Sequence, residues 1–119
     1  MSSNEIVQSF LTTYYNSLQN NRSQMGGYYR ESSTLTYEGD ERKGIKSISD
    51  KFNQLSFQNI QFQFENHDFQ SSLNGLIVAV NGRLLMDNEN QFKFFQVFQI
   101  SQDQQGFYIS NDIFRLILS

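Results

Sequence analysis

The chain has 119 residues, of which 38% are hydrophobic and 15% aromatic, and this predicts one folded domain, residues 1–119, with a Phe-rich core. It contains no Cys, which excludes a disulfide framework, a thiolate metal site and a cysteine nucleophile. The formal net charge of -3 would repel nucleic-acid phosphates, so we expect no nucleic-acid partner and favour a partner with a basic surface.

The sequence also bears on the compartment. Met1–Glu5 lacks the charged start and apolar run of a signal peptide, and the longest apolar run, Leu76–Val80, is too short to span a bilayer. We therefore expect a cytosolic protein with access to the nucleus and no membrane insertion.

The first half of the chain is predicted to form three helices and one short strand. A helix is predicted over Glu5–Gln19, a short one over Arg22–Tyr29, a strand over Thr34–Tyr37 and a third helix over Gly44–Leu55. The first helix places its apolar residues on one face: Val7, Leu11, Tyr14, Tyr15 and Leu18.

The second half changes to an alternation of period two, which is typical of strands. The alternation begins at Ile60, and three further long strands are predicted over Leu76–Leu85, Gln91–Ser101 and Phe107–Leu118, with hairpin turns between them. Helices followed by an antiparallel meander predict an α+β domain.

One predicted strand carries apolar groups on both faces. Phe94, Phe98 and Ile100 share one face, and Phe95 and Val97 share the other. Burying two large side chains contributes about 3 to 6 kcal/mol, so we expect Phe95 and Val97 to form a homodimer interface. The alternative is that a curved sheet encloses both faces within one chain.

Several blocks resemble the nuclear transport factor 2 family along Val7–Leu118. In chain order they are Phe10–Tyr15, Asn21–Gly26, Leu35–Gly39, Leu55–Gln58, Asp87–Glu89 and Asn111–Leu116. The resemblance implies a cone-like α+β fold in which a curved sheet wraps around a helix, and dimerisation through the sheets. It also implies a carrier that needs no cofactor or metal and moves GDP-bound Ran through nuclear pores, with the cytoplasm, nucleus and nuclear envelope as its locations.

The same resemblance implies a Ran-binding site. In the family a hydrophobic cavity receives a Phe of Ran, and acidic residues at its rim pair with basic Ran side chains. The matching positions here are Glu38, Asp87 and Glu89, with Tyr37 as an aromatic at the rim. An acidic hairpin turn without a binding role is the alternative for Asp87 and Glu89.

A second implied partner is the Phe-Gly repeat of nucleoporins, bound in an apolar site at the dimer seam. The chain has no Trp, although many relatives place one just before the first helix, so Ile6 is the partial substitute. Leu55 and Phe57 are the other candidates for this site, with a role in the core as the alternative.

The block Asn111–Arg115 is expected to be structural. Asp112 and Arg115 would satisfy buried polar groups and close the cone through a paired charge.

Enzymes of the same fold, such as ketosteroid isomerases and scytalone dehydratases, keep small-molecule binding and catalysis open as an alternative. His67 is the one His and is expected in a solvated turn, while Tyr14 is expected in the core, so we predict no catalytic residues. A further alternative is an interaction module like those of stress-granule scaffolds or messenger RNA export factors, whose relatives share the Asn111–Arg115 pattern.

Overall fold

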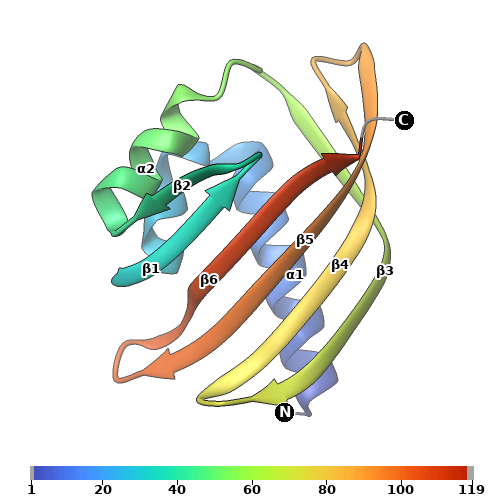
Figure 1. Ribbon diagram of the computed structural model, residues 1–119. Coiled ribbons are helices and arrows are strands. Elements are labelled where there is room, and N and C mark those ends of the chain that lie inside the picture. The colour runs from blue at the N-terminus through green and yellow to red at the C-terminus, as the bar shows by residue number, and fades with distance from the viewer. Residues whose placement is uncertain (1, 118–119) are drawn as a thin grey trace.

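The computed structural model describes residues 2–117, and these form helices packed against one curved sheet (Figure 1). In chain order the elements are α1 (Ser3–Asn20), η1 (Arg22–Tyr28), β1 (Tyr29–Tyr37), β2 (Asp40–Lys43), α2 (Ile45–Gln54), β3 (Ile60–Ser72), β4 (Gly75–Met86), β5 (Asn90–Asp103) and β6 (Gly106–Ile117). The predicted α+β class is confirmed.

The strands lie in the order β2-β1-β6-β5-β4-β3. Neighbours pair antiparallel except β1 and β6, which run parallel, with Leu35 opposite Asp112 and Tyr37 opposite Phe114. Figure 1 shows α1 and α2 on one side of the sheet, which curves around α1, while the opposite side carries no helix. The sheet therefore has an inner face that packs on the helices and an uncovered outer face.

The long helix begins and packs as its sequence predicts. Ser2 and Glu5 form a reciprocal capping box, in which the backbone N–H of Glu5 donates to Ser2 Oγ at 3.2 Å. The predicted apolar face is buried: Val7, Leu11, Tyr14, Tyr15 and Leu18. Phe94, Phe98 and Ile100 of β5 meet this face from the sheet. The core therefore lies between α1 and the inner face.

A bend in the sheet coincides with a glycine and a bulge. The pairing of β3 with β4 shifts register between Phe64 and Asn66, next to the pair Phe64 and Gly82. A Cβ at Gly82 would lie 2.1 Å from the carbonyl oxygen of Gln63, so no other residue fits there without moving the backbone. This close approach helps the outer strands curl toward α1.

Two elements differ from the sequence-based prediction. The first strand begins at Tyr29, five residues before the expected Thr34. Tyr29 pairs with Ile109 of β6, and the register shifts across the polar residues between Tyr29 and Thr34, which show no apolar alternation. The segment Asp40–Lys43, for which the sequence predicted no strand, pairs with β1 as β2. Leu118, the expected end of the last strand, lies outside the described residues.

Candidate functional site

The end of β1 and the turn that follows it hold two of the predicted Ran-binding residues, Tyr37 and Glu38. Glu38 adopts a φ of 53°, its backbone N–H donates to the Phe114 carbonyl oxygen at 3.0 Å, and its carboxylate accepts from the backbone N–H of Leu116. The Tyr37 ring stacks on Phe114 with 4.7 Å between ring centroids. Burial, followed by the negative charge of Glu38, raises the pKa of Tyr37 to about 12, so its hydroxyl stays neutral.

The other two predicted residues lie in the turn between β4 and β5. Asp87 Oδ1 accepts from the backbone N–H groups of Gln58 and Asn59, each at 2.8 Å, and thereby ties this turn to the segment that leads into β3. Asp87 and Glu89 are both exposed. Asp87 therefore has a structural role in addition to any contact with a partner, whereas no side-chain hydrogen bond of Glu89 is found within residues 2–117.

A row of aromatic rings crosses the inner face, and Figure 1 shows the β1–β2 and β4–β5 turns toward the same end of the sheet. Phe114 stacks on Phe94 at 5.8 Å, and Phe94 meets Phe62 edge to face at 5.3 Å. With the stacked Tyr37, these rings run over four strands. Phe94 and Phe114 are buried, whereas Tyr37 and Phe62 are half-buried and present apolar surface.

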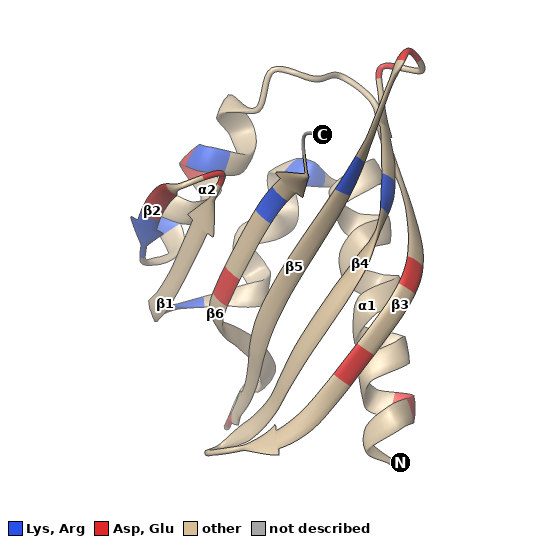
Figure 2. Ribbon diagram, turned by 45° about the vertical axis from the view of Figure 1, so that its right-hand side comes forward, with Lys and Arg blue, Asp and Glu red and all other residues tan. Residues whose placement is uncertain are grey.

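The acidic residues at these two turns differ from the nearby Asp40 in their ion pairing. Asp40 contacts Arg42 at 3.0 Å and Lys51 at 3.1 Å, and hydrogen bonds from these two side chains lower its pKa. Within the described residues no salt bridge involves Glu38, Asp87 or Glu89. Figure 2 shows acidic residues at the tip of the β4–β5 hairpin, away from basic ones. These carboxylates are available to a basic partner.

The residues predicted for nucleoporin repeats are not together in one chain. Ile6 lies in the first turns of α1, at the end marked N in Figure 1, whereas Leu55 and Phe57 follow α2 at the opposite end. Phe57 is buried, and the Arg22 guanidinium lies 4.5 Å from its ring centroid. The structure therefore gives Phe57 a core role, while Ile6 and Leu55 keep partial exposure.

The outer face of the sheet carries an apolar patch. Phe95 is 39% exposed and Ile113 is 49% exposed, and the half-buried Val97 is paired directly with Ile113. The alternative that the curved sheet encloses both faces of β5 is therefore wrong. Ile77 and Ile117 are further exposed residues of this face. We define the outer patch as Ile77, Phe95, Val97, Ile113 and Ile117.

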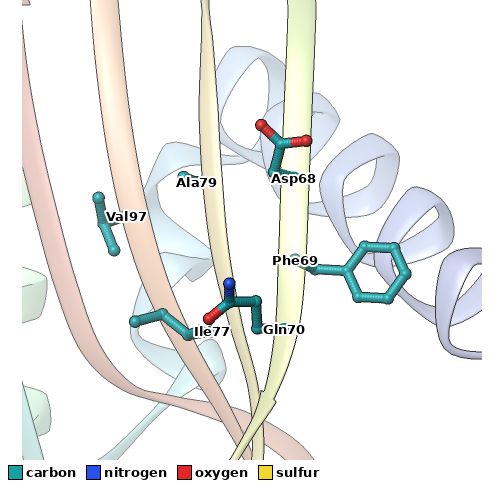
Figure 3. A pocket seen from close by; sticks show the side chains of 6 residues that line it. All are labelled: Asp68, Phe69, Gln70, Ile77, Ala79 and Val97. Carbon is teal, nitrogen blue, oxygen red and sulfur yellow. The ribbon is translucent and has the colours of Figure 1, made fainter.

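A shallow hollow adjoins the outer patch (Figure 3). Ala79 and Ile77 of β4 lie between Val97 of β5 and the polar side chains of β3, Asp68 and Gln70. The hollow has a volume of about 230 Å³, so it can accept an apolar side chain of a facing surface. The sequence predicted Phe95 and Val97 for this face. It did not predict Ile113, because Asp112 and Arg115 beside it were interpreted as a charge pair.

Asp112 is the centre of a buried hydrogen-bond network. Its Oδ2 accepts from the hydroxyls of Tyr29 at 2.8 Å and Tyr14 at 3.2 Å, and its Oδ1 accepts from Gln96 Nε2 at 2.8 Å. Tyr15 donates to Gln96 Oε1 at 2.5 Å, which extends the network to a second tyrosine of α1. The network joins α1, β1, β5 and β6.

Burial raises the pKa of Asp112 to about 6, although the hydrogen bonds from Gln96, Tyr29 and Tyr14 act in the opposite direction. Burial, and then the carboxylate of Asp112, raise the pKa values of Tyr14 and Tyr15. The expected ion pair between Asp112 and Arg115 is wrong, since residues three apart in a strand face opposite sides, and Arg115 is exposed. The hydroxyls of Tyr29 and Tyr14 and the side-chain amide of Gln96 contact the Asp112 carboxylate in place of the expected cation.

The structure also corrects the place of His67. It lies inside β3 opposite Val80, and the strand continues to Ser72, so the expected solvated turn is wrong. Within residues 2–117 no group of three or more His, Asp or Glu side chains could hold a metal ion. Neither α-helix of these residues is long and apolar enough to cross a membrane.

The chain is similar to known proteins in sequence and in structure. Residues 6–116 match the family described as nuclear transport factor 2 (NTF2) domain. Nuclear transport factor 2 of Candida glabrata is 41% identical over 119 residues, which cover 98% of this chain and 95% of that protein. The solved structure of nuclear transport factor 2 from Cryptosporidium parvum has a TM-score of 0.92 and 40% identity, covering 96% of this chain and 94% of that one.

The fold also occurs in proteins of other kinds. A putative scytalone dehydratase from Novosphingobium aromaticivorans has a TM-score of 0.79 at 9% identity, covering 98% of this chain and 87% of that one, which shows the fold alone. The relatives that are similar in sequence over nearly the whole chain carry the name of a transport factor, so the function class expected from the sequence, a nuclear transport carrier, is confirmed. The chain belongs to the nuclear transport factor 2 domain family.

Proposed function

We propose that this chain is a non-enzymatic nuclear import carrier that binds GDP-bound Ran and contacts Phe-Gly repeats of nucleoporins in the nuclear pore. The observation that carries the Ran proposal is the row of aromatic rings next to the β1–β2 turn, which holds Glu38. The β4–β5 turn, which holds Asp87 and Glu89, lies toward the same end of the molecule. The row offers apolar surface, and the carboxylates offer negative charge without internal ion pairs.

The energetics of such a site divide between two kinds of contact. Burying one Phe of the partner against the aromatic row would contribute about 1.5 to 3 kcal/mol. Each exposed ion pair would contribute at most about 1 kcal/mol and would mainly set the orientation and the rate of encounter. An aromatic anchor with flanking acids therefore suits a basic partner that inserts an aromatic side chain, which is what the family resemblance implies for Ran.

We further propose that the carrier is a homodimer formed through the outer patch. Phe95, Ile113 and Ile77 expose large apolar side chains on a face that no helix covers. The adjoining hollow between Val97 and β3 gives this face the relief that two interlocking surfaces need. The same patch on both copies is expected of a two-fold symmetric dimer.

The pore contacts follow from the same proposal. The relatives that the chain resembles carry the name nuclear transport factor 2. A carrier that moves between cytoplasm and nucleus would meet nucleoporins at the pore. Ile6 and Leu55 offer partly exposed apolar surface for Phe-Gly repeats. We do not propose Phe57 for repeat binding, because it is buried.

The buried network supports a role without catalysis. A general base must lie within hydrogen-bond reach of a substrate. Both carboxylate oxygens of Asp112 accept hydrogen bonds from Tyr29, Tyr14 and Gln96, and the carboxylate is buried. Among the described residues no buried side-chain polar atom lacks a partner, so this interior serves to hold the fold.

The test is a calorimetric titration of the purified protein with Ran loaded with GDP and, separately, with a GTP analogue. Light scattering on the same sample gives its mass. Binding by a dimer to the GDP form, with much weaker binding to the GTP form, supports the proposal. A folded protein that binds neither form would refute the Ran part.

A further inference from the structure

The outer face of the sheet carries opposite charges on either side of β5. Asp68 lies on the edge strand β3, opposite Ala79 of β4, whereas Arg115 lies on β6, opposite Phe95 of β5. Figure 2 shows acidic residues on β3 and basic residues on β4, β5 and β6. Asp68 and Arg115 are both exposed, and within residues 2–117 neither side chain takes part in a salt bridge. Each charge is therefore available to a facing surface.

Asp68 borders a groove that suits a long basic side chain. The shallow hollow of about 230 Å³ beside Asp68, Ala79 and Val97 adjoins a second hollow of about 130 Å³, which the same three residues line together with Phe95 and Asn81. Among the described residues that line either hollow, Asp68 alone is charged. Arg and Lys side chains pack their methylene stems on apolar surface and keep their charged ends at polar groups. The apolar residues of the groove and its single carboxylate offer both contacts.

The spacing of the strands selects Arg115 as the residue of a second copy that reaches this groove. In a two-fold symmetric interface the same contact occurs twice, so its two residues lie at similar distances from the axis. Val97 lies between the patch residues of β4 and β6 and is the reference point here. With strands about 4.8 Å apart and about 6.7 Å for every second residue, Asp68 lies about 10 Å from Val97 and Arg115 about 8 Å. Lys93, on β5 itself, lies about 13 Å away.

We propose that Arg115 of each copy enters the groove of the other copy and pairs with Asp68, so that two identical ion pairs align the two outer faces. The inference rests on the proposed homodimer and names the residues that make this face specific for a second copy of the chain. Packing against Val97 and Phe95 removes water from each pair, which strengthens the attraction. Apolar burial drives the association, while the charges disfavour misaligned pairings.

The experiment uses two charge reversals, Asp68→Arg and Arg115→Asp, and follows the mass of each protein by light scattering over a dilution series. Either reversal alone places like charges against each other twice in the homodimer. When the two variants are mixed in equal amounts, a heterodimer regains two opposite-charge pairs. Lys93→Asp is the matched control, because Lys93 is an exposed basic residue of the same face that lies further from Val97. Circular dichroism checks that each variant is folded.

We expect the dissociation constant of each reversal alone to rise on the order of 100-fold, about tenfold for each of the two pairs. The mixture of Asp68→Arg and Arg115→Asp should form a dimer close to wild-type strength, whereas Asp68→Arg mixed with Lys93→Asp should not.

Three outcomes would contradict the inference. Reversals that dimerise normally by themselves, or an Asp68→Arg and Arg115→Asp mixture that stays monomeric, would overturn the ion pair and leave the homodimer in place. Equal rescue by Lys93→Asp would overturn Arg115 as the partner of Asp68. A monomeric wild type would overturn both the ion pair and the proposed homodimer.

Discussion

Replacing Asp112 by Asn tests whether a buried carboxylate makes the stability of this fold depend on pH. Asn has the same shape, and its carbonyl oxygen can accept from Tyr29 and Tyr14 as Oδ2 does now. The Gln96 amide can turn over so that its oxygen accepts from the new Asn amide, with the Tyr15 hydroxyl rotating to match. The substitution therefore removes one titrating group and keeps the network.

The magnitude follows from the pKa of Asp112, which is about 6 in the folded protein against the ordinary value of 3.8. Between these values the folded state binds a proton that the unfolded state has released, so rising pH destabilises the fold. The stabilising contribution is complete below about pH 4 and is lost as pH rises through about 6. At about 1.4 kcal/mol per pKa unit, the loss is about 3 kcal/mol.

The assay is urea unfolding of wild type and Asp112→Asn at a series of pH values from 4 to 7, with protein concentration fixed because the proposed dimerisation would contribute to stability. Other carboxylates titrate in both proteins, so the difference between the two free energies of unfolding isolates Asp112. We expect this difference to favour the wild type more at pH 4 than at pH 7. A difference that stays constant across the range would refute the reasoning.

Further predictions follow from single contacts. Ile113→Glu places a charge in the outer patch and should give a monomer by light scattering; a dimer of unchanged strength would move the interface elsewhere. Glu38→Ala should lower the unfolding free energy by about 1 kcal/mol, because the Leu116 N–H loses its acceptor, whereas Glu38→Gln keeps an acceptor oxygen and should unfold like the wild type. Equal stability of these two variants would show that the hydrogen bond contributes nothing. Gly82→Ala should destabilise by about 1 to 3 kcal/mol in thermal unfolding, since its Cβ meets the Gln63 carbonyl oxygen; an unchanged midpoint would contradict that account.

The fold was largely predictable because its long elements carry strong periodic patterns. The apolar face of α1 and the alternation in β5 were both read correctly from the sequence. The first five residues of β1 and all of β2 were not, because Tyr29–Ser33 and Asp40–Lys43 are mostly polar. Pairing rather than local pattern defines these strands, and Asp112, the parallel partner of Leu35 in β1, lies 77 residues further along the chain (112 − 35).

The candidate site was less predictable, since partners in space leave no local pattern. Asp112 looked like half of a charge pair with Arg115, and only strand geometry shows that they face opposite sides. Phe57 was a candidate either for repeat binding or for the core, and the structure buries it with the Arg22 guanidinium over its ring.

The structure also explains why some acidic positions at the turns are poor tests of binding. Asp87 holds the backbone N–H groups of Gln58 and Asn59, so its removal would disturb the turn as well as any partner contact. Glu89 is exposed, and none of the hydrogen bonds found among the described residues uses its side chain. Charge must therefore be removed with amides that keep each acceptor oxygen in place.

The most direct test of the account is the affinity of GDP-bound Ran for a variant with Glu38→Gln, Asp87→Asn and Glu89→Gln, measured by calorimetry beside the wild type. The three amides preserve the acceptors for Leu116, Gln58 and Asn59 while removing three negative charges. At up to about 1 kcal/mol for each lost ion pair, we predict a loss of up to about 100-fold in affinity with an unchanged melting temperature. If the variant binds GDP-bound Ran as tightly as the wild type does, the account is contradicted, because the acidic turns are then not the Ran site.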